Sequence, residues 1–99
     1  MKLPYYAVIF TSTRTAVDDG YAEMATKMVE LAQQQDGFLG VESARNEVGI
    51  TVSYWRDLAS IKNWKNHLDH LEAQQKGQST WYQNYTVRIA LVEREYSFK

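Results

Sequence analysis

The chain of 99 residues contains no cysteine, a single proline and no long hydrophobic run. The absence of cysteine excludes disulfides, thiolate catalysis and cysteine-based zinc sites. The only proline is Pro4, so proline interrupts no helix or strand later in the chain. No apolar run reaches the roughly 18 residues of a membrane span, and the N-terminus lacks the apolar core of a signal peptide. We therefore predict a cytoplasmic protein that has no membrane partner.

An excess of charge of either sign is also missing, because 11 basic residues stand against 12 acidic ones. Proteins that bind DNA or RNA generally present a basic face, so no nucleic-acid partner is predicted. Aromatic residues, by contrast, are plentiful, with three Trp and seven Tyr. Such rings need a core, a ligand pocket or a subunit interface to cover them. The length fits a single domain over residues 1–99.

Hydrophobic periodicity predicts six elements in the order strand, helix, strand, strand, helix, strand. The predicted strands cover residues 5–13, 38–45, 50–55 and 86–96, and the predicted helices cover residues 21–35 and 59–75. Residues 81–85 are predicted to be an aromatic, polar connector. The predicted helix caps are Asp18 or Asp19 for the first helix and Asp57 or Ser60 for the second.

This order of elements predicts an α+β protein with a ferredoxin-like βαββαβ fold, in which two helices cover one face of an antiparallel sheet. Several strands carry apolar residues on both faces; Ala7, Val8, Ile9 and Phe10, for example, follow one another directly. A monomer would leave the second face of the sheet uncovered. We therefore predict a homodimer in which two sheets pack face to face.

Residues 52–67 carry a family resemblance, with the sequence VSYWRDLASIKNWKNH. A strand ending in Tyr-Trp, followed by a helix with Trp and His, resembles the antibiotic biosynthesis monooxygenase family. Residues 37–43, 73–77 and 81–89 fit the same pattern. The resemblance implies a dimeric α/β barrel with a pocket between the sheet and helices of each subunit. It also implies a monooxygenase that oxidises a small aromatic, polyketide or quinol-like compound with dioxygen and without a cofactor.

Two branches of that family can be compared with this chain residue by residue. The haem-degrading branch has an Asn on the first strand and a His ten residues after the helix Trp. Trp64 matches the Trp, but Gln74 stands at the His position and residues 7–10 contain no Asn. In the polyketide-oxygenase branch an Asn precedes the Trp by four residues, and here that residue is Ser60. Both branches thus match this chain only in part. Two alternatives to the oxygenase are considered: a haem-binding or haem-degrading protein, and a non-enzymatic dimer that binds small molecules.

The catalytic candidates are His67, Trp64 and Arg88. In these roles Trp64 lines the pocket, His67 moves a proton and Arg88 holds an oxyanion. The structural alternatives are a core position for Trp64, helix packing for His67 and an interface salt bridge for Arg88.

The substrate-binding candidates are Tyr54, His70, Tyr82 and Tyr85. The alternative for the tyrosines is a place in the core or at the interface. His67 and His70 share one side of a helix, but no matching set of carboxylates accompanies them. No metal site is predicted.

Overall fold

The computed structural model describes residues 2–75 and 81–99, with the side chains of residues 2–69 and 81–99. Its elements are β1 (Tyr5–Arg14), α1 (Tyr21–Gln33), β2 (Phe38–Arg45), β3 (Gly49–Trp55), α2 (Leu58–Gln75) and β4 (Tyr82–Val92). The predicted order of elements is confirmed. Within the described residues, neither helix combines the length and the hydropathy that crossing a membrane requires.

The last strand differs most from its prediction, since it begins at Tyr82 rather than at residue 86 and ends at Val92 rather than at residue 96. Its backbone pairs along the whole of β1, from Tyr5 opposite Val92 to Arg14 opposite Tyr82. The hydrogen bonds that pair two strands come from the backbone, so they tolerate polar side chains. Residues 82–85, which were predicted to belong to a connector, therefore extend the strand.

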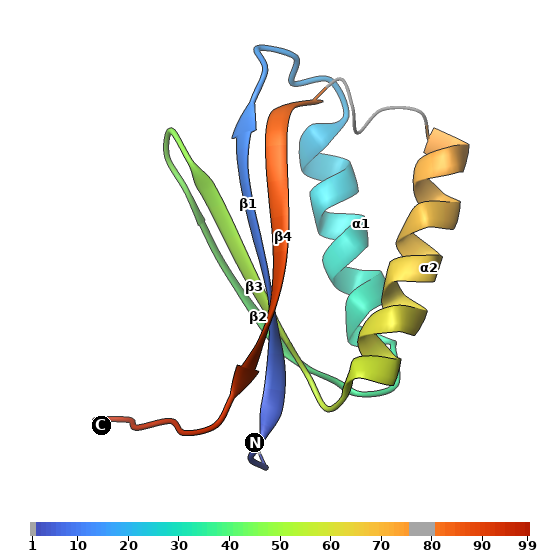
Figure 1. Ribbon diagram of the computed structural model, residues 1–99. Coiled ribbons are helices and arrows are strands. Elements are labelled where there is room, and N and C mark those ends of the chain that lie inside the picture. Colours follow the sequence, from blue (N-terminus) through green and yellow to red (C-terminus); the bar gives the residue numbers. More distant parts are fainter. Residues whose placement is uncertain (1, 76–80) are drawn as a thin grey trace.

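The four strands form one antiparallel sheet in the order β2-β3-β1-β4, and both helices lie on the same side of it (Figure 1). This is the ferredoxin-like fold that the sequence predicts. Successive side chains of a strand point to opposite faces, and residues paired across strands share a face. Phe10 and its partner Val87 therefore face the helices, whereas Ile9 and its partner Arg88 lie on the other face, here called the open face.

The buried core lies where β3 ends and α2 begins. It consists of Ala32, Trp55, Ile61 and Trp64, and we call this region the packed end. Trp55 is completely buried, its ring lies edge-on to Phe38 at 5.4 Å, and it stacks with Trp64 at 6.0 Å. The indole N–H of Trp55 donates to the Ser53 hydroxyl at 2.9 Å, so its polar atom is also satisfied.

The two helices begin differently. Asp57 caps α2, because its Oδ1 accepts the backbone N–H of Ser60 at 2.8 Å and the Ser60 hydroxyl at 2.7 Å. The prediction that Asp18 or Asp19 caps α1 is wrong. Gly20 occupies the N-cap position with a φ of 77° and contributes no side-chain hydrogen bond. Asp18 pairs with Arg14 instead.

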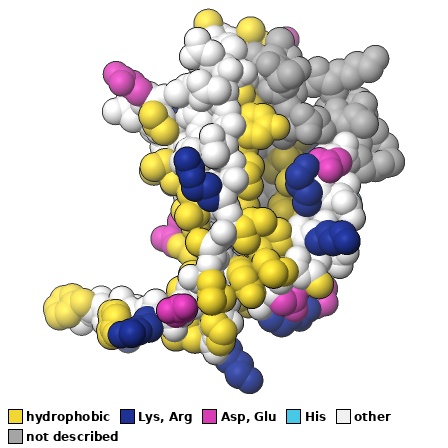
Figure 2. Space-filling view, in the orientation of Figure 1, with side chains coloured by type: hydrophobic (Ala, Val, Ile, Leu, Met, Phe, Trp, Pro, Cys, Tyr) yellow, Lys and Arg dark blue, Asp and Glu magenta, His cyan; other side chains and the backbone are white. Residues whose placement is uncertain are grey.

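Strand β4 is exposed over residues 83–91. Val87, Ile89 and Leu91 are 49%, 53% and 47% exposed, although they lie on the face of the sheet that carries the helices. The reason is that α1 packs against β2 and α2 against β3, which leaves the β4 edge uncovered. A single chain therefore leaves the helix-bearing side of β4 largely exposed. Figure 2 shows hydrophobic side chains gathered between β4 and the helices.

Candidate functional site

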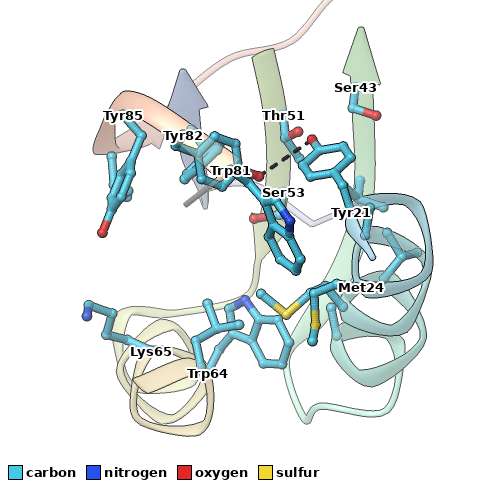
Figure 3. A pocket seen from close by; sticks show the side chains of 18 of the residues that line it. Tyr21, Met24, Ser43, Thr51, Ser53, Trp64, Lys65, Trp81, Tyr82 and Tyr85 are labelled. Atoms are coloured by element: carbon cyan, nitrogen blue, oxygen red, sulfur yellow. Dashed lines mark hydrogen bonds between the residues drawn. The ribbon is translucent and has the colours of Figure 1, made fainter. Parts of the chain in front are cut away.

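A cavity of about 360 Å³ lies between the helix-bearing face of the sheet and the two helices. It continues from the packed end toward the start of α1, and we call this second region the hollow end. Side chains from β1, β2, β3, β4 and both helices line it (Figure 3). A concave site with apolar walls and a few polar groups is typical of small-molecule binding.

The floor of the cavity carries three small hydroxyl side chains. Ser43 on β2 pairs with Thr51 on β3, and Ser53 lies two residues further along β3 on the same face. At the next position on this face, Trp55 fills the space under the helices. The cavity therefore exists because small residues replace bulky ones toward the hairpin that joins β2 and β3.

The walls are aromatic and thioether side chains. Met24 and Met28 come from α1, Trp64 comes from α2, and Trp81 precedes β4. Trp81 is held in place because its indole N–H donates to the carbonyl of Asp19 at 2.8 Å. Flat aromatic molecules pack well against such rings and against polarizable sulfur.

A pair of phenols forms the polar end of the cavity. The Tyr82 hydroxyl donates to the Tyr21 hydroxyl at 3.5 Å, and the Arg14 guanidinium lies 3.5 Å above the centre of the Tyr21 ring. Burial, together with the hydrogen bond to Tyr21, raises the pKa of Tyr82. The guanidinium groups of Arg45 and Arg14 oppose that shift without reversing it. Tyr82 is thus a neutral hydrogen-bond donor at physiological pH.

Three of the predicted site residues, Trp64, Tyr82 and Tyr85, line the cavity. His67 does not line it; its imidazole stacks against Trp64 at 5.7 Å. The buried Nε2 of His67 has no hydrogen-bond partner in the described part of the chain. The side chains of His70 and Gln74 lie outside the described residues. The structure thus brings together one catalytic candidate and two substrate-binding candidates.

Tyr54 and Arg88 lie on the open face, so the prediction that they share a pocket with Trp64 is wrong for this cavity. Tyr54 pairs with Ala7 and Arg88 with Ile9, one residue out of step with the positions that face the helices. The Tyr54 hydroxyl donates to Glu42 at 2.7 Å. That hydrogen bond, together with burial, raises the pKa of Tyr54 to about 12.

Several cavity residues were not predicted from the sequence as part of a site, among them Tyr21, Met24, Ser43, Thr51 and Trp81. Tyr21 and Met24 belong to the apolar stripe of α1, a pattern that is typical of core packing, yet both are only half-buried. The sequence of β3 did contain an indication of the cavity. Thr51 and Ser53 share the face that Trp55 marks as internal, and small hydroxyl residues on an internal face indicate unfilled space.

Known proteins resemble this chain in sequence and in fold. Residues 4–76 match the family model described as antibiotic biosynthesis monooxygenase. The uncharacterized protein YqjZ of Bacillus subtilis (strain 168) is 51% identical over 98 residues, which cover 97% of this chain and 86% of the relative.

Two solved structures with low sequence identity show the same fold. SnoaB, a cofactor-independent oxygenase from Streptomyces nogalater, has a TM-score of 0.66 at 12% identity, with 95% of this chain and 96% of that chain covered. A dabb family protein with a ferredoxin-like fold from Mesorhizobium loti has a TM-score of 0.63 at 10% identity, with 88% and 95% covered.

Proposed function

The chain belongs to the antibiotic biosynthesis monooxygenase family, and from this premise we propose that it oxidises a small aromatic or quinol-like compound with dioxygen and without a bound cofactor. The observation that carries the proposal is the cavity, which combines aromatic walls with a hydroxyl-bearing floor. SnoaB, which shares the fold, is a cofactor-independent oxygenase, and that description supports the same chemistry here.

The substrate itself supplies the electrons in such a reaction. When a ring CH₂ group and O₂ become a ring carbonyl and water, the CH₂ group loses four electrons and O₂ gains them. When a quinol and O₂ become a quinone and hydrogen peroxide, the quinol loses two electrons and O₂ gains them. No outside reductant is needed. The protein contributes binding, orientation and exclusion of water. In our proposal Trp64 and Met24 hold the ring system, and the floor hydroxyls orient its oxygen atoms.

The size of the cavity favours a compact substrate. Its volume of about 360 Å³ is near the lower end of the roughly 300–1,000 Å³ that is usual for small-molecule sites. Two or three fused rings suit this space better than a large polyketide.

His67 stacks against Trp64 and does not line the cavity, so we propose that it positions the Trp64 indole and does not contact the substrate directly.

Oxygen uptake tests the proposal. Anthrone and 1,4-dihydroxynaphthalene are incubated with the pure protein, and uptake is compared with the spontaneous rate in buffer. We expect uptake well above that rate, and a loss of about tenfold in Trp64→Phe, because a smaller ring positions the substrate poorly. Tyr96→Phe is the matched control, since Tyr96 is 87% exposed.

Uptake equal to the buffer rate for both compounds would contradict the oxygenase proposal. If the compounds still bind in that case, a non-enzymatic binding protein is the better description. An undiminished rate in Trp64→Phe would remove Trp64 from the mechanism.

We also propose that the protein is a homodimer. Both helices lie on one side of the sheet, so no helix of the described residues covers the open face, and the β4 edge is exposed as well (Figure 1). Light scattering should give twice the chain mass of 11.5 kDa. Ile9→Glu places a charge on the open face and should give monomers, whereas Val48→Glu in the exposed hairpin should not. A wild-type mass of one chain would contradict the dimer.

The cytoplasmic location that we infer from the sequence stays a prediction.

A further inference from the structure

The hydroxyls of Tyr21 and Tyr82 lie 3.5 Å apart, at the outer limit of a hydrogen bond. Hydrogen bonds between hydroxyl groups are usually about 2.7–2.8 Å long, so this pair is weakly bonded. Both O–H groups can rotate, with little loss, toward a third oxygen that lies to one side of the pair within hydrogen-bond reach of both. Figure 3 shows the two rings converging on this point at the edge of the cavity.

The surroundings hold both rings in place. The Arg14 guanidinium covers the Tyr21 ring at 3.5 Å and is itself fixed, because it donates to the carbonyl of Val17 at 2.9 Å and to Asp18 at 3.2 Å. Tyr21 also meets Trp81 edge-on at 5.8 Å, and Tyr82 meets Phe10 edge-on at 5.4 Å. Two donors that are already oriented lose little entropy when they bind an acceptor.

The positive charges of Arg14 and Arg45 favour a ligand oxygen that carries partial negative charge. Arg14 lies over one phenol, and the guanidinium groups of Arg14 and Arg45 both influence the other. Arg45 reaches this end of the sheet from β2, where it donates to the buried hydroxyl of Ser12. A cation over the face of a phenol polarises its O–H and strengthens it as a donor.

We propose that Tyr21 and Tyr82 form a two-donor clamp that binds one phenol or carbonyl oxygen of a flat aromatic ligand and so determines how the ligand is oriented in the cavity. The inference rests on the proposed function, because it takes the cavity to be the ligand site. It adds the specificity-determining residues and the ligand group that they recognise.

Binding of two ligands of nearly equal shape tests the clamp. Equilibrium dialysis at neutral pH measures the affinity for 2-naphthol and for 2-methylnaphthalene, which differ by a hydroxyl in place of a methyl group. We expect the wild type to prefer 2-naphthol at least tenfold. Tyr21→Phe and Tyr82→Phe should each lower that preference about fivefold, the loss that follows from one neutral hydrogen bond.

Tyr96→Phe is the matched control, because Tyr96 is 87% exposed and is not among the residues that line the cavity. It should leave the preference unchanged. Circular dichroism confirms that each variant is folded, and all three replacements keep the ring.

Two results would overturn the inference, and they differ from each other. If the double variant Tyr21→Phe with Tyr82→Phe keeps the wild-type preference, the clamp is wrong while the cavity remains a binding site. If the wild type binds neither compound, the proposed binding of small aromatic ligands fails, and the clamp fails with it.

Discussion

The packed end and the hollow end share one face of one sheet, yet they are built differently. At the packed end, Trp55 fills the space under the helices and α2 begins with an aspartate cap. At the hollow end, Thr51 leaves the space open and α1 begins at Gly20 without a side-chain cap. Under the proposed function, the packed end stabilises the fold and the hollow end of the same layer binds the ligand.

The largest expected effect is on stability at the packed end. Trp55→Ala removes a completely buried indole and should lower the free energy of unfolding by about 3–5 kcal/mol. Tyr85→Ala removes an aromatic ring from the hollow end, where the side chain is 50% exposed, and should cost less than half as much. Urea denaturation at one protein concentration measures both. Equal losses would show that the two ends are packed alike.

The next effect is on binding at the hollow end. Thr51→Leu places a larger side chain on the cavity floor and should weaken binding of 2-naphthol at least tenfold, about 1.4 kcal/mol. Stability should change by less than about 1.5 kcal/mol, because the cavity has room for the added atoms. Ile50→Leu is the matched control, since the neighbouring residue points to the open face. Unchanged affinity in Thr51→Leu would mean that the ligand does not use this floor.

The sequence was enough to predict the order of elements, because four strands and two helices each follow their own hydrophobic period. It also predicted the packed end, where Ile61 and Trp64 lie one turn apart on α2 and are both buried. The position of β4 relative to the helices was not predictable in the same way. An apolar stripe such as Val87, Ile89 and Leu91 shows that a face should be covered, but not whether the same chain covers it.

The site was predicted only in part, for two physical reasons. A shift of one residue along a strand moves a side chain to the opposite face, so Arg88 and Tyr54 could not be assigned to a face before the register was known. A cavity is also a property of several elements together. Tyr21 and Tyr82 are 61 residues apart in sequence, and only the fold brings their hydroxyls together.

A smaller effect on stability is expected at the packed end, where α2 begins. Hydrogen bonds from Ser60 and Arg56 lower the pKa of Asp57 from 3.8 to about 2. Because the folded state lowers this pKa, Asp57 stabilises the protein fully above pH 3.8, and the stabilisation is lost as the pH falls toward about 2. Asp57→Ala should therefore lower the melting temperature at neutral pH, and the difference from wild type should shrink through this acid range. A difference that does not depend on pH would contradict the assigned charge effect.

The smallest effect is expected where α1 begins at the hollow end. Asp18 precedes a helix, as Asp57 does, but its side chain is 86% exposed and its partner is Arg14 rather than a helix N–H group. An exposed ion pair of this kind contributes about 0–1 kcal/mol, so Asp18→Ala should shift the free energy of unfolding by less than about 1 kcal/mol. Thermal melts of Asp18→Ala and Asp57→Ala under identical conditions make the comparison direct. If the two variants lose equal stability, Asp18 is a cap after all, and the start of α1 is fixed as firmly as the start of α2.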